Sequence, residues 1–127
     1  MNRKIIATDK SPGAIGPYSQ ANAAGGFLFT AGQIPLDPQT MEVVGTTAAE
    51  QARQAILNGK AVVEAGGMTL SDVIKCTVFI MDMNEFAAIN EIYAEYFGEN
   101  PPARSVVQVS RLPKDVLVEI EMIAYSG

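Results

Sequence analysis

Residues 103–125 read ARSVVQVSRLPKDVLVEIEMIAY, and this stretch decides the fold. Strands are expected over residues 104–110 and 116–125, within which apolar and polar residues alternate at 107–110 and at 118–122. A period of two is typical of a β-strand whose two faces meet different surroundings. With Leu112-Pro113 as the turn between them, these strands are expected to pair as an antiparallel hairpin at the end of the chain.

Strand parity then assigns the side chains of this hairpin to faces. Val106 is expected to lie opposite Glu119, so Arg104, Val106 and Glu119 would share one face of the sheet. Val118 and the odd-numbered residues of 105–109 would point the other way, toward the core that the helices cover.

The remaining elements follow from periodicity and from turn and capping residues. Gly25-Gly26 separates two short apolar runs, which predicts a hairpin. Thr47 and Glu50 have the spacing of a capping box at a helix N-terminus, Gly66-Gly67 ends that helix, and Asp82 is expected to cap a second one. Strands are expected at residues 4–7, 21–24, 27–31 and 73–80, and helices between residues 46 and 66 and between residues 82 and 98, in the order β-β-β-α-β-α-β-β.

Length and composition indicate an α+β protein of one folded domain, residues 1–127, since 48% of the 127 residues are apolar. No run is long and apolar enough to span a bilayer, and the first residues lack the apolar segment of a signal peptide. We therefore expect no membrane association and a cytoplasmic location.

Missing residue types restrict the chemistry. The chain has no histidine, which removes the commonest general base and metal ligand and every histidine-dependent nucleophile pair. The one cysteine, Cys76, is expected on an apolar strand face with Ile74, Val78 and Ile80, as a core residue rather than a nucleophile. The net charge of −5 and nine scattered basic residues argue against nucleic acid as the main partner.

The face expected to carry Arg104 and Glu119 also carries Leu117, Ile123 and Tyr125. Such a face is too apolar to remain in water, and both helices are expected on the other side of the sheet. Packing against another subunit is therefore expected, and a site with Arg104 and Glu119 would lie in or beside that interface.

Arg104 and Glu119 are the strongest candidates for a site. Arg104 follows two prolines, which stiffen the start of its strand, and a guanidinium matches a carboxylate in bidentate geometry. It is either the anchor of a ligand carboxylate or part of a structural ion pair with Glu119 or Glu121. Glu119 is either a water-activating carboxylate or a salt-bridged interface residue.

Two weaker candidates lie near the N-terminus. The segment Thr30-Ala31-Gly32-Gln33 ends a strand in glycine, where backbone N–H groups can approach a ligand, although most such glycines only make turns. Tyr18, on the turn Gly16-Pro17-Tyr18-Ser19, is equally compatible with packing.

Taken together, these segments resemble the Rid family of reactive-intermediate (enamine/imine) deaminases, over essentially the whole chain and in the right order. The matching segments are Ala14-Ile15-Gly16-Pro17-Tyr18, Thr30-Ala31-Gly32-Gln33-Ile34-Pro35, Gln51-Ala52-Arg53-Gln54, Val78-Phe79-Ile80, Asn90, Tyr93, Pro102-Ala103-Arg104-Ser105, Arg111-Leu112-Pro113-Lys114-Asp115 and Val118-Glu119-Ile120-Glu121.

The resemblance implies a chorismate-mutase-like fold, in which a mixed β-sheet carries two helices on one face, assembled as a homotrimer with sites between subunits. It implies hydrolysis of small 2-imino or enamine acids, such as 2-iminopropanoate and 2-iminobutanoate, to 2-keto acids and ammonia. No cofactor or metal is expected. Two other functions stay open, a non-catalytic trimer that binds small keto or amino acids and a ribonuclease or translation inhibitor.

Carried over residue by residue, the resemblance makes Arg104 the clamp of the substrate carboxylate, supported by the backbone N–H of Gly32. It makes Glu119 the residue that positions or activates the attacking water. Tyr18, Asn90 and Tyr93 would shape the pocket. Two positions depart from many family members, which have serine where Ala31 stands and cysteine where Val106 stands, so one hydroxyl contact and any thiol role there are lost.

Overall fold

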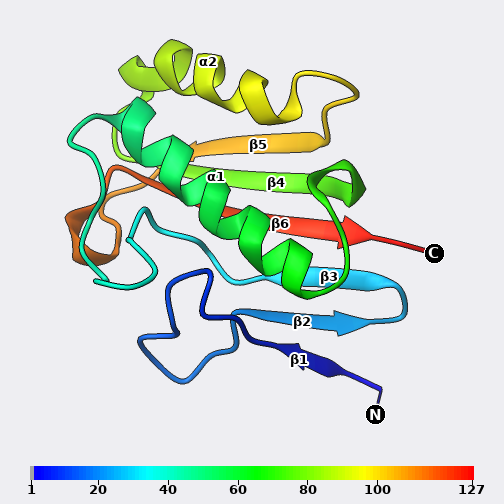
Figure 1. Cartoon of the computed structure of the whole chain (residues 1–127). Helices are drawn as coiled ribbons and strands as arrows, with labels where there is room; N and C mark the ends of the chain where they lie inside the picture. The colour runs from blue at the N-terminus through cyan, green and yellow to red at the C-terminus, as the bar shows by residue number, and fades with distance from the viewer. Residues whose placement is uncertain (1) are drawn as a thin grey trace.

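The computed structural model describes residues 2–127 as one six-stranded mixed sheet with both long helices on the same face (Figure 1). The predicted α+β architecture and element order are confirmed. The strands are β1 (Lys4–Ile6), β2 (Ala21–Ala24), β3 (Phe27–Thr30), β4 (Val73–Ile80), β5 (Ala103–Gln108) and β6 (Val118–Tyr125), the helices are α1 (Ala48–Ala65) and α2 (Phe86–Phe97), and three short 3-10 turns span Leu70–Asp72, Met83–Glu85 and Pro113–Asp115.

The terminal hairpin predicted from residues 103–125 is wrong. The strand order is β1-β2-β3-β6-β4-β5, so β4 lies between β5 and β6 (Figure 1). β5 runs parallel to β4 and is connected to it through α2, while β6 is antiparallel to both β4 and β3. A strand, a helix and a parallel strand form a crossover unit, and this unit places β5 on the edge of the sheet.

The face predicted for Arg104 is also wrong. Arg104 pairs with Cys76 of β4, and Cys76 is fully buried beneath the helices. Neighbouring partners on adjacent strands point to the same face, so Arg104 and Val106 lie on the helix side. Glu119 pairs with Phe79 and points to the opposite face, which no helix of residues 2–127 covers.

The boundaries of α1 agree with its capping signals, but the prediction that Asp82 caps the second helix is wrong, because Glu85 is the N-cap of α2. The Thr47 side chain accepts the backbone N–H of Glu50, whose carboxylate accepts the backbone N–H of Thr47, and Gly66 ends α1. Asp82 caps the 3-10 turn that precedes α2, accepting the backbone N–H of Asn84. α1 packs its small and β-branched face on β6 and β3, and it also packs on α2.

One face assignment within β4 fails at a β-bulge. Cys76, Val78 and Ile80 are buried as predicted, but Ile74 is 46% exposed and Val73 is buried in its place. The register with β6 shifts between Val73 and Lys75, because the bulge inserts one unpaired residue.

The uncovered face of the sheet is markedly apolar. Phe27, Phe29 and Tyr125 are 39%, 49% and 42% exposed, and the tilted rings of Phe27 and Tyr125 pack with their centres 4.7 Å apart. Val107 of β5 adds a further exposed apolar side chain at 42%. Exposed apolar side chains therefore gather on this face, and its packing against another subunit stays a prediction.

Candidate functional site

Arg104 is held in a cradle that α2 provides. Its Nη1 donates to Oδ1 of Asn90 over 2.8 Å. The guanidinium carbon lies 4.7 Å from the centre of the Tyr93 ring and 5.4 Å from that of Phe86. These three residues are spaced i, i+4 and i+7, so they share one face of the helix. Aromatic faces and an amide oxygen stabilise the cation without neutralising it.

No carboxylate of residues 2–127 lies within salt-bridge distance of Arg104; the three ion pairs join Arg53 to Glu95, Lys60 to Glu64 and Arg111 to Asp115. The structural ion pair with Glu119 or Glu121 is therefore absent within the chain, since both glutamates lie on the opposite face. The free part of the guanidinium fork remains available to an anion.

Beneath Arg104 lie two buried groups that support the cradle. Tyr93 is 6% exposed, and burial raises the pKa of its phenol far above the ordinary value. Cys76 is fully buried, and burial likewise raises the pKa of its thiol, which a contact with Tyr93 and the charge of Arg104 partly offset. Both groups stay neutral at physiological pH, so the interpretation of Cys76 as a core residue is confirmed.

Glu119 occupies a separate place on the uncovered face. It precedes Ile120, whose backbone exchanges two hydrogen bonds with Gln33 at 2.7 and 3.0 Å. This pairing brings Gly32 directly under the carboxylate: a Cβ at Gly32 would lie 2.5 Å from Oε2 of Glu119. Position 32 must therefore be glycine for the carboxylate to lie where it does.

The surroundings of Glu119 favour its neutral form. Burial is the main cause that raises the pKa of its carboxyl, and the charge of Glu121 adds to the effect. A general base is most effective when its pKa approaches the working pH, and the shift of Glu119 is in that direction.

A hollow of about 250 Å³ opens beside Glu119. Its lining is apolar apart from the carboxylate, the Tyr18 phenol and backbone groups. The lining residues are Ile15, Tyr18, Ala31, Gly32, Ile34, Pro113 and Glu119.

The predicted site residues thus form two groups on opposite sides of the sheet. Arg104, Asn90 and Tyr93 come together on the helix side of β5, and Tyr18, Ala31, Gly32 and Glu119 come together on the uncovered face. β4 separates β5 from β6, which places the two strands about 10 Å apart. One chain cannot present both groups to one small molecule.

Some residues of each group could not be assigned to the site from the sequence. Phe86 is 37% exposed and faces Arg104, although it was not among the predicted site residues. Its spacing to Asn90 and Tyr93 was the signal that could have placed it. Ile15, Ile34 and Pro113 border the Glu119 hollow, but only their segments could be identified from the sequence.

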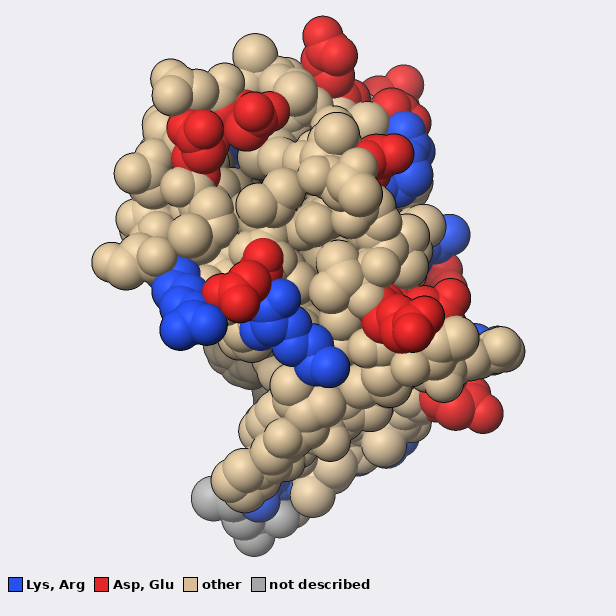
Figure 2. Space-filling view, turned by 90° about the vertical axis from the view of Figure 1, so that its left-hand side faces the viewer, with Lys and Arg blue, Asp and Glu red and all other residues tan. Residues whose placement is uncertain are grey.

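One face of the described part of the chain shows no concentration of basic side chains, as the net charge of −5 and the scattered basic residues predict. On the face shown in Figure 2, the few Lys and Arg side chains lie beside acidic ones, and no basic stripe is visible. Residues 2–127 hold no group of three acidic or cysteine side chains arranged for a metal ion. None of the helices within the same residues is both long enough and apolar enough to cross a membrane.

Comparison with known proteins identifies the family. The pattern of the family described as Endoribonuclease L-PSP matches residues 8–126. The chain belongs to that family. A RutC family protein of Pyrococcus horikoshii is 60% identical over 123 residues, which cover 97% of this chain and 98% of the relative. TdcF of Escherichia coli, provisionally named a reactive intermediate deaminase, is 53% identical over 125 residues, 96% of each chain.

Solved structures of similar sequence share the fold. The crystal structure of E. coli TdcF with bound serine has a TM-score of 0.92 at 52% identity, covering 98% of this chain and 99% of that one. RidA from the Antarctic bacterium Psychrobacter sp. has a TM-score of 0.93 at 44% identity, covering 97% and 99%. The predicted membership of the Rid family is therefore confirmed.

Proposed function

We propose that this protein hydrolyses small 2-imino or enamine acids, such as 2-iminopropanoate and 2-iminobutanoate, to 2-keto acids and ammonia in the cytoplasm. The observation that carries the proposal is that, within residues 2–127, Arg104 and Glu119 each bear an unpaired charge, of opposite sign. In that part of the chain, Arg104 is a fixed cation without a carboxylate partner, and Glu119 is a half-buried carboxylate without a cation partner. A 2-imino acid supplies both missing charges, a carboxylate and an iminium nitrogen.

The two groups must come from different subunits to act on one substrate. The carboxylate carbon of a 2-imino acid is bonded directly to the imine carbon, so both groups must reach the same few atoms. We propose a homotrimer in which Arg104 of one subunit faces the Glu119 hollow of its neighbour. The apolar uncovered face, with Phe27, Phe29 and Tyr125 exposed, supplies surface for such an interface.

The proposed chemistry needs few groups. Arg104 would clamp the substrate carboxylate with its fork, and the backbone N–H of Gly32 would add a donor. Glu119 would accept a proton from water while the water oxygen bonds to the imine carbon. Glu119 would then return that proton to the carbinolamine nitrogen, which leaves as ammonia while the hydroxyl proton passes to water and the carbon–oxygen double bond forms, and no cofactor enters the balance.

The acceleration that this reaction requires is modest. Imines are already electrophilic and hydrolyse in water, so orientation and one general base are sufficient. A positioned base contributes about 10²- to 10⁴-fold. Loss of serine at position 31 and of cysteine at position 106 leaves Arg104 and Glu119 intact.

The test is ammonia release from freshly generated 2-iminopropanoate, with and without protein. Arg104→Ala should lower the rate, since it removes the carboxylate clamp. Arg53→Ala is the matched control, because Arg53 pairs with Glu95 on the surface and should not matter for turnover. Unchanged turnover in Arg104→Ala would show that the assigned role is wrong.

Two other functions are also tested. The family description suggests a ribonuclease, and the serine bound to TdcF suggests a binder of small amino or keto acids. Calorimetric binding of small keto or amino acids without turnover above buffer would favour a regulatory binder. RNA cleavage that persists through repurification and falls in Glu119→Gln would favour a ribonuclease, against which the charge of −5 and the missing histidine argue.

A further inference from the structure

The loop between β1 and β2, residues 7–20, carries Tyr18 to the Glu119 hollow. This loop has no regular secondary structure, and only short local hydrogen bonds fix Tyr18 itself: its N–H donates to Gly16 O at 2.8 Å, and its hydroxyl accepts the Ile15 N–H at 3.2 Å. A loop of this length needs ties elsewhere to keep one conformation.

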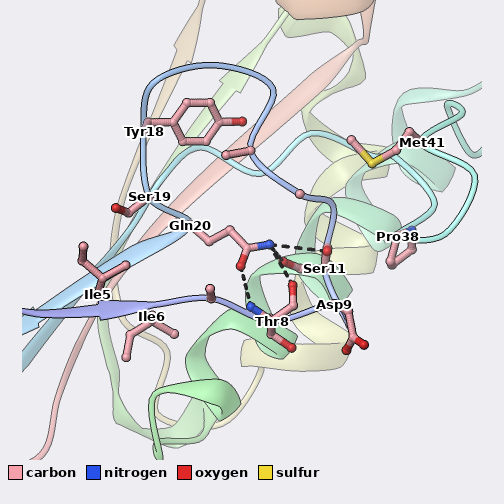
Figure 3. A pocket seen from close by; sticks show the side chains of 13 residues that line it. Ile5, Ile6, Thr8, Asp9, Ser11, Tyr18, Ser19, Gln20, Pro38 and Met41 are labelled. Carbon is pink, nitrogen blue, oxygen red and sulfur yellow. Dashed lines mark hydrogen bonds between the residues drawn. The ribbon is translucent and has the colours of Figure 1, made fainter.

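Those ties come from the side chain of Gln20, which is 6% exposed (Figure 3). Its Oε1 accepts the backbone N–H of Thr8 at 2.6 Å. Its Nε2 lies 3.0 Å from Thr8 O, 2.9 Å from Ser11 Oγ and 2.8 Å from Pro12 O. One carboxamide thus joins the last residue of the loop to residues near its start.

The network requires a carboxamide at this position. One end of the side chain meets an N–H donor and the other meets oxygens only, so the group must accept at one end and donate at the other. Leucine would leave the Thr8 N–H and the buried oxygens without partners, and glutamate would place a charge against carbonyl groups.

Gln20 is also tied to the other side of the hollow. Its backbone carbonyl accepts the N–H of Ala31 at 2.8 Å, directly before Gly32. The same residue therefore links the segment bearing Tyr18 to the segment on which the Glu119 carboxylate rests.

We propose that Gln20 is a positioning residue of this site: its buried carboxamide closes the loop of residues 7–20 and thereby holds Tyr18 over the Glu119 hollow. The inference rests on the proposed function for the identity of the substrate, but the anchoring itself is a property of the chain. Gln20 touches no reacting atom and acts through Tyr18.

A double-mutant cycle on imine hydrolysis tests the functional part. Gln20→Leu should raise KM about tenfold and change kcat less, because a displaced Tyr18 weakens binding more than chemistry. In a Tyr18→Ala background the same substitution should change KM less than about twofold, because its route of action is gone.

Limited trypsin digestion tests the anchoring without any substrate. Lys10 lies inside the loop and is exposed, so the Lys10–Ser11 bond reports local opening. Gln20→Leu should speed cleavage at this bond about tenfold or more at 25 °C. Val62→Ala is the control: it removes part of a fully buried side chain in α1 and lowers stability without touching the loop.

The outcomes separate this inference from the proposed function. Equal cleavage rates in Gln20→Leu and wild type, or a KM effect that persists fully in Tyr18→Ala, would overturn the positioning role. A wild type without turnover would refute the proposed reaction. The double-mutant cycle of Gln20→Leu and Tyr18→Ala would then be measured with the dissociation constant of pyruvate, a 2-keto acid, in place of KM. Absence of both turnover and pyruvate binding would overturn both proposals.

Discussion

Two inactive variants, Arg104→Ala and Glu119→Gln, are expected to restore activity when they are unfolded and refolded together. The reason is geometric: Arg104 and Glu119 lie on opposite faces of the sheet, with β4 between their strands. A site that needs both must draw them from different subunits. In a mixed ring, some sites combine the intact Arg104 of one variant with the intact Glu119 of the other.

The size of the recovery follows from counting sites. Loss of two charged hydrogen bonds at about 1.5–3 kcal/mol each should lower the activity of Arg104→Ala about 10²- to 10⁴-fold. Loss of the base should lower that of Glu119→Gln by a similar factor. After random 1:1 assembly each site has one chance in two of either intact residue, so about a quarter of wild-type activity should return in any closed ring.

The assay measures ammonia release per milligram of refolded mixture at several ratios of the two variants. Recovery should peak at 1:1 and vanish at either end. The double variant, Arg104→Ala with Glu119→Gln, refolded with Arg104→Ala is the matched control and should recover nothing. A 1:1 mixture as inactive as its parents, although mass spectrometry shows mixed oligomers, would refute a site shared between subunits.

Three further predictions concern single substitutions. Because burial raises the pKa of Glu119 in the folded chain, its charge opposes folding above that pKa, so Glu119→Gln should raise the thermal midpoint at pH 7. That advantage should disappear below about pH 4, where folded and unfolded states both hold the proton, as circular dichroism across pH can show. Asn90→Leu should raise KM about tenfold with a smaller change in kcat, because Arg104 loses the acceptor of its Nη1. Thr47→Ala should cost about 1 kcal/mol of stability by removing one half of the capping box with Glu50, measured by denaturant unfolding, with kcat/KM unchanged at 25 °C.

Each of these predictions has an outcome that contradicts it. A thermal midpoint of Glu119→Gln that falls at pH 7 would mean that the carboxylate stabilises the fold. Equal losses in kcat and kcat/KM for Asn90→Leu would place Asn90 at the reacting atoms rather than behind Arg104. A loss of activity in Thr47→Ala at a temperature where it is fully folded would connect the start of α1 to the site.

Alternation along the last strand predicted its two faces correctly. Val118, Ile120 and Met122 are buried, and Glu119 points away from them. The face to which each side chain points can be predicted from the strand alone, because side-chain direction within one strand depends only on its own period of two. The capping box of Thr47 and Glu50 can be predicted from local sequence in the same way.

The pairing of the strands could not be predicted from local alternation of residue types. The nearness of β5 and β6 along the chain favours a hairpin, but α2 returns the chain so that β5 pairs with β4 in parallel. The same error placed Arg104 on the wrong face, since parity was propagated through a turn that does not pair its two strands. The bulge at Ile74 escaped prediction because an unpaired residue changes register without changing composition.

The sequence predicted which residues form the candidate site better than it predicted how they are arranged in space. Residue types and strand faces singled out Arg104 and Glu119, and the family resemblance assigned their roles. Only the fold showed that α2 holds Arg104 while Gly32 and the loop of residues 7–20 hold Glu119. Phe86 contacts Arg104 from another element, and its spacing to Asn90 and Tyr93 on α2 is the one local signal that pointed to it.

The central place of β6 has a consequence for biosynthesis. The last strand of the chain pairs with β3 on one side and β4 on the other, so it joins the two halves of the sheet. Contacts between residues so far apart in sequence close late and slow folding. Until the ribosome has released residues 118–125, the nascent chain exposes two sheet fragments with open edges. We therefore expect the unfinished chain to be prone to aggregation, and truncations that remove part of β6 to leave the two halves of the sheet unjoined.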